Sequence, residues 1–329
     1  MPEFGYSVDM RSPDFGTPHQ TLYAEMLKMV EWGDTHGIDY IQLMEHHGST
    51  DGYLPSPLVF AAAIAARTER MRIQIGALLL PLHDPVNVAE DFAVADLISG
   101  GRITLVLGAG YNRPEFAMFR KRLEDRAKAL DEGTEIILRA LSGERFEFDG
   151  REIFVRPLPV QDPKLAVLTG GGVPASAKRA IRFGLGMYPM NEETAVAYEE
   201  GCAAIGRKPG YVYRSMGWTH IAEDPDKAWS QLLPHVSHVV NSYVQFAKGT
   251  TSSSGFEFIT TAEAARDSGI ISILTPDQAV ERCRLADERN ATITFAPMIG
   301  GLDPAIGWEM LELFHAKVLP RVRATAEPA

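Results

Sequence analysis

Short apolar runs alternate with longer amphipathic segments along almost the whole chain, and this alternation is what most restricts the fold. Several runs are apolar on both faces, as in a parallel sheet that helices cover on both sides. Repeated strand–helix units of this kind indicate an α/β protein. The predicted strands lie at residues 4–8, 38–44, 73–80, 103–107, 165–169, 185–189, 212–221 and 292–296.

Helical periodicity fills the gaps between these strands, and proline stands at the start of several helices, where a first turn tolerates it. The predicted helices begin near residues 21, 57, 85, 124, 174, 192 and 304. Eight strand–helix units predict a closed (β/α)8 TIM-like barrel that spans residues 1–329 as a single domain. The alternative is an open, doubly wound sheet, which usually carries fewer strands.

Two insertions interrupt the alternation. Period-two alternation in residues 145–156, around Asp149 and Gly150, predicts a β-hairpin. Residues 234–269 have the sequence KGTTSSSG near their centre, which is too polar for a barrel wall. We expect a mobile, lid-like segment there. The aromatic rings of Phe246, Phe256 and Phe258 would pack toward a substrate pocket or form a small satellite core under the loop.

Composition excludes several classes of protein. The 329 residues are 45% hydrophobic and 23% charged, with a net charge of −11 and a pI of about 5.3. Such a charge disfavours nucleic acids and anionic membranes as partners. No apolar run approaches the roughly 20 residues of a membrane span, and we expect no secretory signal. Cys202 and Cys283 are the only cysteines, which favours a reducing, cytoplasmic location.

The second predicted strand ends at Glu45-His46-His47, and active sites of such barrels lie at the C-terminal ends of the strands. Neighbouring residues of a strand point to opposite faces, so both histidines cannot face one ion while the strand continues. No other metal-ligand motif occurs, and we predict no metal site. His46 is a candidate general acid or base, whereas His47 is more simply a polar loop residue.

A glycine-rich turn follows the fifth predicted strand, at Gly170-Gly171-Gly172, and Val173 and Pro174 then open a helix. Free backbone N–H groups at a helix N-terminus suit a phosphate, and the Ser176 hydroxyl can add a hydrogen bond. The spacing is neither a P-loop nor a Rossmann fingerprint. Arg126 is a candidate second anion ligand; otherwise it is a solvated helix charge.

These motifs together resemble the bacterial luciferase-like flavin monooxygenase family. The similarity rests on EHH at 45–47, on residues 56–116, and on LEDRAKALDEGTEII at 123–137. It continues in Pro157, Gln161 and Pro163, the glycine turn with its proline, and LTPDQ at 274–278. It covers nearly the whole chain except residues 234–269.

The resemblance implies a barrel that binds reduced FMN, with a deazaflavin as the less favoured cofactor. His46 would lie near the reactive edge of the flavin. A non-prolyl cis peptide bond, here Gly76–Ala77, would lie beneath the ring. The phosphate would contact Arg126, Ser176 and the backbone of Gly171, Gly172 and Val173. Glu45 and Tyr111 are the remaining expected cofactor contacts.

The implied activity is that of a flavin-dependent monooxygenase. Reduced FMN, supplied by a separate flavin reductase, would react with O₂ to form a C4a-(hydro)peroxyflavin that oxygenates a small organic substrate. The family also implies a homodimer through the helices after the second and third strands. Luciferases have arginine where this chain has Ala109, which weakens the case for light emission; Arg113 is a candidate replacement.

Three alternatives remain beside this interpretation. The first is a non-catalytic flavin-binding protein on the same barrel, because a fold does not dictate a function. The second is a deazaflavin-dependent oxidoreductase. The third, a metal-dependent barrel hydrolase, is disfavoured by the arrangement of the histidines.

Overall fold

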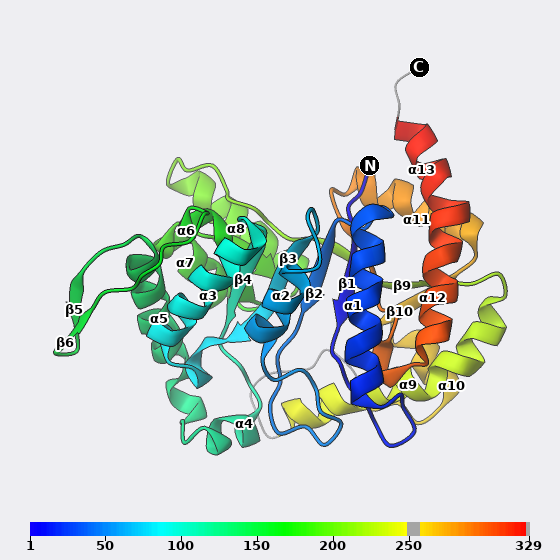
Figure 1. Ribbon diagram of the computed structural model, residues 1–329, viewed down its shortest axis with the longest axis horizontal. Coiled ribbons are helices and arrows are strands. Elements are labelled where there is room, and N and C mark those ends of the chain that lie inside the picture. Colours follow the sequence, from blue (N-terminus) through cyan, green and yellow to red (C-terminus); the bar gives the residue numbers. More distant parts are fainter. Residues whose placement is uncertain (249–256, 327–329) are drawn as a thin grey trace. The chain divides into compact units, whose positions relative to one another are not determined.

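The computed structural model describes residues 1–248 and 257–326, which fall into two compact units (Figure 1). Unit 1 comprises Met1–Gln42, His47–Pro55 and the described chain from Arg214 onward. Unit 2 comprises Leu43–His46 and Ser56–Tyr213. The eight predicted strands are all present, and the chain has the α/β architecture that their alternation with helices predicts.

Parallel strands form the centre of unit 1. Their order is β10 (Ile271–Leu274), β9 (Ser215–Ile221), β11 (Thr292–Phe295), β1 (Phe4–Val8) and β2 (Tyr40–Leu43). Phe4 pairs with Ile293 and Tyr6 with Phe295, so β1 and β11 run side by side. The C-terminal ends of these parallel strands therefore lie at one edge of the sheet. The sequence patterns did not predict β10, which is only four residues long.

The strands of unit 2 are also parallel, in the order β3 (Arg72–Leu79), β4 (Ile103–Gly108), β7 (Val167–Gly171) and β8 (Gly186–Pro189). Leu79 pairs with Gly108, and Gly171 pairs with Pro189. The predicted hairpin is also present, as β5 (Phe146–Phe148) and β6 (Arg151–Ile153), which pair antiparallel.

Helices follow the strands in both units. In unit 1 they are α1 (His19–Thr35), α9 (Pro225–Ala247), α10 (Ala262–Asp267), α11 (Pro276–Glu288), α12 (Pro304–Leu313) and α13 (Leu319–Ala326). In unit 2 they are α2 (Pro57–Ala65), α3 (Pro85–Ser99), α4 (Arg113–Met118), α5 (Arg126–Leu141), α6 (Pro163–Ala166), α7 (Pro174–Phe183) and α8 (Glu192–Ala204). Among the residues that the structure describes, no helix is long and apolar enough to cross a membrane.

The structure corrects the interpretation of residues 234–269 as one lid-like insertion. Residues 234–247 continue α9, which passes through Pro234 and has Val236, Val239 and Val240 buried in a core with Leu232. These valines recur at helical spacing, a signal that the polar sequence downstream obscured. Phe246 is half-buried, whereas Phe258 is exposed. Residues 249–256, which include Phe256 and most of the KGTTSSSG run, lie outside the described residues.

Both cysteines are buried free thiols: Cys202 lies on α8 and Cys283 on α11. Each packs among apolar side chains as a small hydrophobic residue does. Neither therefore constrains the fold through a covalent bond.

Arg102 holds the start of the unit 2 sheet to its helices. Its guanidinium donates to the carbonyls of Ala65, Thr68, Met71 and Ser99 at 2.6–3.0 Å, and to the Thr68 hydroxyl at 2.8 Å. These acceptors end α2 and α3 and precede β3. One side chain therefore satisfies carbonyls that the helix ends leave without intrahelical donors.

We expect Arg102→Met to lower the free energy of unfolding by about 3 kcal/mol, because each buried acceptor left unpaired costs roughly 1–3 kcal/mol. Urea unfolding followed by circular dichroism measures the change. Arg151→Met, on the exposed hairpin, is the control and should leave stability almost unaltered. A loss below about 1 kcal/mol for Arg102→Met would mean that other donors replace the guanidinium.

Candidate functional site

Glu45 follows β2 and is the first buried charge of the candidate site. Its Oε2 accepts the backbone N–H of Leu79 at 2.7 Å, and its Oε1 lies 2.6 Å from Nε2 of His83. A buried carboxylate needs such partners to offset its lost hydration. Glu45 thereby ties the chain after β2 to the end of β3.

His46 is paired with a second buried carboxylate. Nδ1 of His46 lies 2.6 Å from Oε1 of Glu115, which stands in the first turn of α4. Both side chains are buried, at 6% and 1% exposure, and the Tyr111 ring meets the imidazole edge-on at 5.7 Å. A carboxylate on Nδ1 orients the ring and directs proton exchange to Nε2.

Small residues gather where β3, β4 and β7 end. A Cβ on Gly108 would come within 2.8 Å of the Ala77 methyl group, and one on Gly170 within 3.8 Å of it. The Gly76–Ala77 peptide bond is cis, as the resemblance implies. Glycine and alanine at these positions therefore let the three strand ends pack closely against one another.

The glycine turn after β7 is built around Ser176. Gly171 has φ of 145°, and a Cβ there would fall 2.2 Å from the Ser176 hydroxyl, so only glycine fits. Ser176 is buried in the first turn of α7, whereas Val173, its N-cap residue, is 56% exposed. Gly172 lies against Met190 and accepts a hydrogen bond from Asn191 at 3.1 Å. The turn thus offers backbone N–H groups and a hydroxyl at a helix N-terminus.

Arg126 is the first residue of α5 and is half-buried; its Nη1 donates to the Leu123 carbonyl at 3.0 Å. Among the described residues it has no hydrogen bond to the glycine turn. The two helices are nevertheless linked, because Asp131 on α5 pairs with Arg179 and Arg182 on α7. Arg113, the candidate replacement for the luciferase arginine, is exposed and pairs with Glu124 at 2.9 Å.

This edge of unit 2 has features that suit a flavin-type cofactor. Ala77, Gly108 and Gly170 carry no long side chain at the ends of β3, β4 and β7. The turn at Gly171 has the open N-terminus that a phosphate requires. Since β3, β4 and β7 are parallel, these features lie at the same edge of the sheet as the oriented imidazole of His46.

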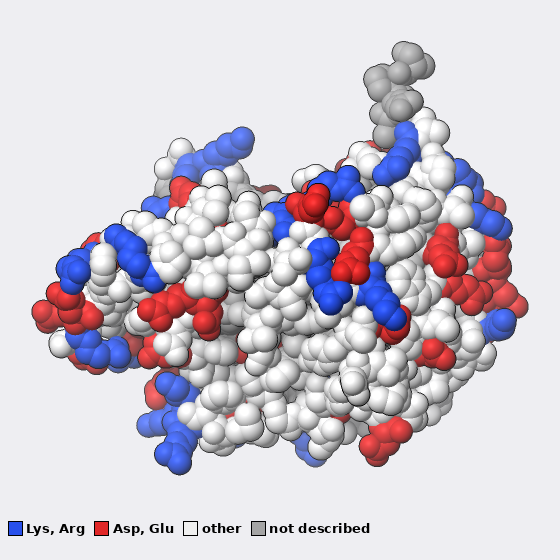
Figure 2. Space-filling model, in the orientation of Figure 1, with Lys and Arg blue, Asp and Glu red and all other residues white. Residues whose placement is uncertain are grey.

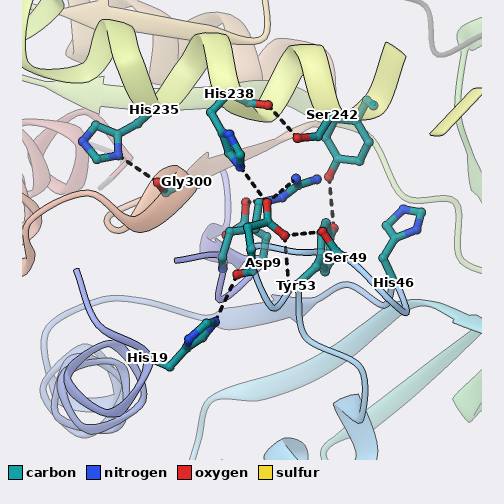
Figure 3. Close-up of polar contacts among 12 residues, drawn as sticks. Asp9, His19, His46, Ser49, Tyr53, His235, His238, Ser242 and Gly300 are labelled. Atoms are coloured by element: carbon teal, nitrogen blue, oxygen red, sulfur yellow. Dashed lines mark hydrogen bonds and ion pairs between the residues drawn. The ribbon is translucent and has the colours of Figure 1, made fainter. Parts of the chain in front are cut away.

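Unit 1 contains a separate polar cluster that the sequence patterns did not reveal (Figure 3). Arg11, fully buried after β1, bonds Asp51 at 3.0 Å and lies 3.4 Å from Asp9. Its guanidinium also lies over the rings of Tyr53 and Tyr243, at 4.3 and 5.0 Å from their centroids. Cation–π contacts of this kind stabilise a buried guanidinium.

Asp51 is the centre of this cluster. Its Oδ2 lies 2.7 Å from Nε2 of His238 on α9, and its other oxygen accepts from the Ser49 hydroxyl. Burial alone would raise the pKa of Asp51, but the hydrogen bond from His238 and the charge of Arg11 lower that pKa far below its usual value. Asp9 differs, because burial raises its pKa more than Arg11 lowers it.

Sequence reasoning missed three features of these sites: Glu115, His83 and the Arg11 cluster. Glu115 is 69 residues from His46, and an acidic residue in a first helical turn is ordinarily a dipole partner. His83 ends the motif Leu80-Pro81-Leu82-His83, so its place after a strand was the available signal. Nothing local marks Arg11 as buried.

Comparison with known proteins agrees with this fold. The family model for luciferase-like monooxygenases matches residues 2–288. Limonene 1,2-monooxygenase of Rhodococcus erythropolis is 25% identical over 280 residues, which cover 80% of this chain and 72% of that protein. The solved structure of monooxygenase RslO1 from Streptomyces bottropensis aligns with a TM-score of 0.81 at 24% identity, over 97% of this chain and 99% of that one.

Relatives with different cofactors are also similar. The oxygenating constituent of 3,6-diketocamphane monooxygenase from Pseudomonas putida, solved in complex with FMN, aligns with a TM-score of 0.72 at 18% identity, over 98% of this chain and 99% of that one. F420-dependent glucose-6-phosphate dehydrogenase of Nocardia farcinica is 25% identical over 92% of this chain and 95% of its own length. The fold is that of the luciferase-like TIM-barrel proteins. The chain belongs to the luciferase-like monooxygenase family.

Proposed function

We propose that the chain is a flavin-dependent monooxygenase, which uses reduced FMN and O₂ to oxygenate a small organic substrate. The observation that carries the proposal is the buried pair of His46 and Glu115, beside strands β3, β4 and β7, which have Ala77, Gly108 and Gly170 near their ends. Membership of the family and the monooxygenases among the relatives support the same conclusion. The substrate is not specified by these residues.

Each proposed cofactor contact follows from a local structure. The Ser176 hydroxyl, the N–H groups of Gly172 and Val173, and the Arg126 guanidinium would hold the phosphate. The ring would lie over Gly76 and Ala77. Glu45 and Tyr111 would complete the cofactor contacts. Bound in this way, reduced FMN supplies the electrons that activate O₂.

The protein's own part in the chemistry is to position groups and to hold a proton. His46 would accept or donate a proton at Nε2, while Glu115 keeps the proton of Nδ1 in place and the ring fixed. Burial of both side chains limits the access of water. In this account Glu115 is a positioning residue and His46 a catalytic one.

A deazaflavin-dependent oxidoreductase is the second candidate, because an F420-dependent relative aligns with 92% of the chain. The same edge of unit 2 would hold that cofactor, but no oxygen would be consumed. Because free reduced FMN also reacts with O₂, oxygen uptake alone does not separate the candidates; a transient near the hydroperoxyflavin band does, and it also excludes a non-catalytic flavin carrier.

The partners follow from this proposal. We propose that a separate reductase supplies reduced flavin and that the protein works in the cytoplasm. We also propose a homodimer through α2 and α3, which expose Val59, Val94, Leu97 and Ile98. Figure 2 shows that the surface over these helices is largely uncharged. Contiguous exposed apolar side chains of this kind are typical of protein interfaces.

Arg126→Ala should weaken the binding of FMN about ten- to a hundredfold, since a hydrogen bond from a charged donor contributes roughly 1.5–3 kcal/mol. Flavin fluorescence titration measures the dissociation constant. Lys128→Ala, an exposed lysine on the same helix, is the control and should leave it unchanged. Equal affinity of Arg126→Ala and the parent would remove Arg126 from the phosphate site.

Replacing His46 with alanine should slow the oxygen-dependent oxidation of bound reduced flavin by roughly 10²–10⁴-fold, the usual contribution of a general acid or base. Glu115→Gln should slow it less and shift its pH profile, because the amide keeps the contact but lacks the charge. Stopped-flow absorbance over pH 5–9 measures both. FMN affinity should stay within about twofold. An unshifted profile for Glu115→Gln would show that its contact with His46 has no part in the reaction.

Light scattering should give a mass about twice the 36.2 kDa of the chain at micromolar concentration. Leu97→Asp should produce the monomer, because it places a charge in the proposed apolar interface. Val196→Asp, on the exposed face of α8, is the control and should stay dimeric. A parent protein that runs as a 36.2 kDa monomer would refute the dimer.

A further inference from the structure

The second half of α9 is held to the rest of unit 1 by polar contacts that use buried groups. Nδ1 of His235 lies 2.8 Å from the Gly300 carbonyl, and Nε2 of His238 lies 2.7 Å from Asp51. The hydroxyl groups of Tyr243 and Tyr53 lie 3.0 Å apart. Figure 3 shows the histidines pointing from the helix toward the loops that follow β1 and β11.

The charges at this contact do not balance without a proton. Asp9 and Asp51 bring two carboxylates, both 4% exposed, and Arg11 brings one permanent cation. Leaving one unbalanced charge in a buried site is costly. One proton, on His238 or on Asp9, makes the cluster neutral.

We propose that Asp9, Arg11, Asp51 and His238 form a proton-dependent clamp, which positions the second half of α9 at the C-terminal edge of the unit 1 sheet. Loss of the single exchangeable proton leaves the cluster with a net negative charge and weakens this hold on the helix. His238 is the positioning residue, because its imidazole joins α9 to Asp51.

The surroundings of His238 are consistent with this assignment. Arg11 and Asp9 face His238 from the end of β1, and Asp51 faces it from the loop after β2. His235 precedes His238 by one turn on α9. The Phe15 ring meets both histidines edge-on, at 5.2 and 5.9 Å. Nε2 of His19 lies 3.0 Å from the backbone carbonyl oxygen of Asp51.

The sign of the pH dependence follows from Asp9. Burial raises the pKa of Asp9. A group with a raised pKa binds its proton more tightly in the docked state, so docking is favoured at low pH and lost as pH rises. One coupled proton changes the docking equilibrium by at most a factor of about ten per pH unit.

A role for the clamp in the reaction rests on the proposed function, because active sites of this fold lie at the C-terminal edge of the strands. The proton dependence of the helix does not need a bound flavin, and it can therefore fail or hold independently of the proposed activity.

Hydrogen–deuterium exchange of the full chain, with and without FMN, tests the clamp in the peptide covering residues 235–247. Measurements at pH 5.5, 6.5, 7.5 and 8.5 are corrected for intrinsic exchange with an unstructured peptide. In the parent we expect protection to fall up to about tenfold per pH unit over part of this range. Protection that does not change with pH would overturn the proposal.

Three variants make the test specific. His238→Asn should lose protection at every pH, because the link to Asp51 is gone. Asp9→Asn should keep protection at every pH, because the cluster is then neutral without a proton. His235→Asn is the matched control, one turn away, and should keep the pH dependence of the parent. The proposed charge balance would be contradicted if Asp9→Asn kept the pH dependence of the parent, or if His238→Asn kept the protection of the parent. Melting curves show whether each variant is folded.

Discussion

Buried carboxylates govern both polar regions of this protein, because a carboxylate removed from water must find donors or cations within the fold. Glu45 and Glu115 in unit 2 meet the imidazoles of His83 and His46. Asp51 in unit 1 meets Arg11 and His238. Each pairing joins a loop at the end of a strand to another element, so the loops acquire a defined position that their own sequences do not provide.

The two regions are suited to different tasks. In unit 2 small residues stand near the ends of β3, β4 and β7, and carboxylate–imidazole pairs follow the neighbouring strand ends. In unit 1 the corresponding edge is filled by Arg11 and the aromatic rings above it. We infer that the first region binds and orients a cofactor, whereas the second fixes a helix through a balance of charge.

The fold was largely predictable, because strand–helix alternation and the proline-led helices are local patterns. The motif at 45–47 and the turn at 170–172 were also predictable, since each is contiguous in sequence, whereas the cis bond at Gly76–Ala77 followed from the family resemblance. Glu115 and His83 were not, because they reach their partners across 69 and 38 residues. The helix after Pro234 was missed because the polar run that follows it hid the buried valines. Partners brought together by the chain's path leave no mark in a single sequence.

Binding of reduced cofactor under anaerobic conditions tests the central claim most directly. The protein is titrated with reduced FMN and, in parallel, with a reduced 5-deazaflavin of the F420 type, and then exposed to O₂ while absorbance and oxygen are recorded. We predict that reduced FMN binds with one molecule per chain and that O₂ then produces a transient absorbance near the hydroperoxyflavin band. Binding of the deazaflavin alone, or oxidation of bound reduced FMN without this transient, would contradict the account.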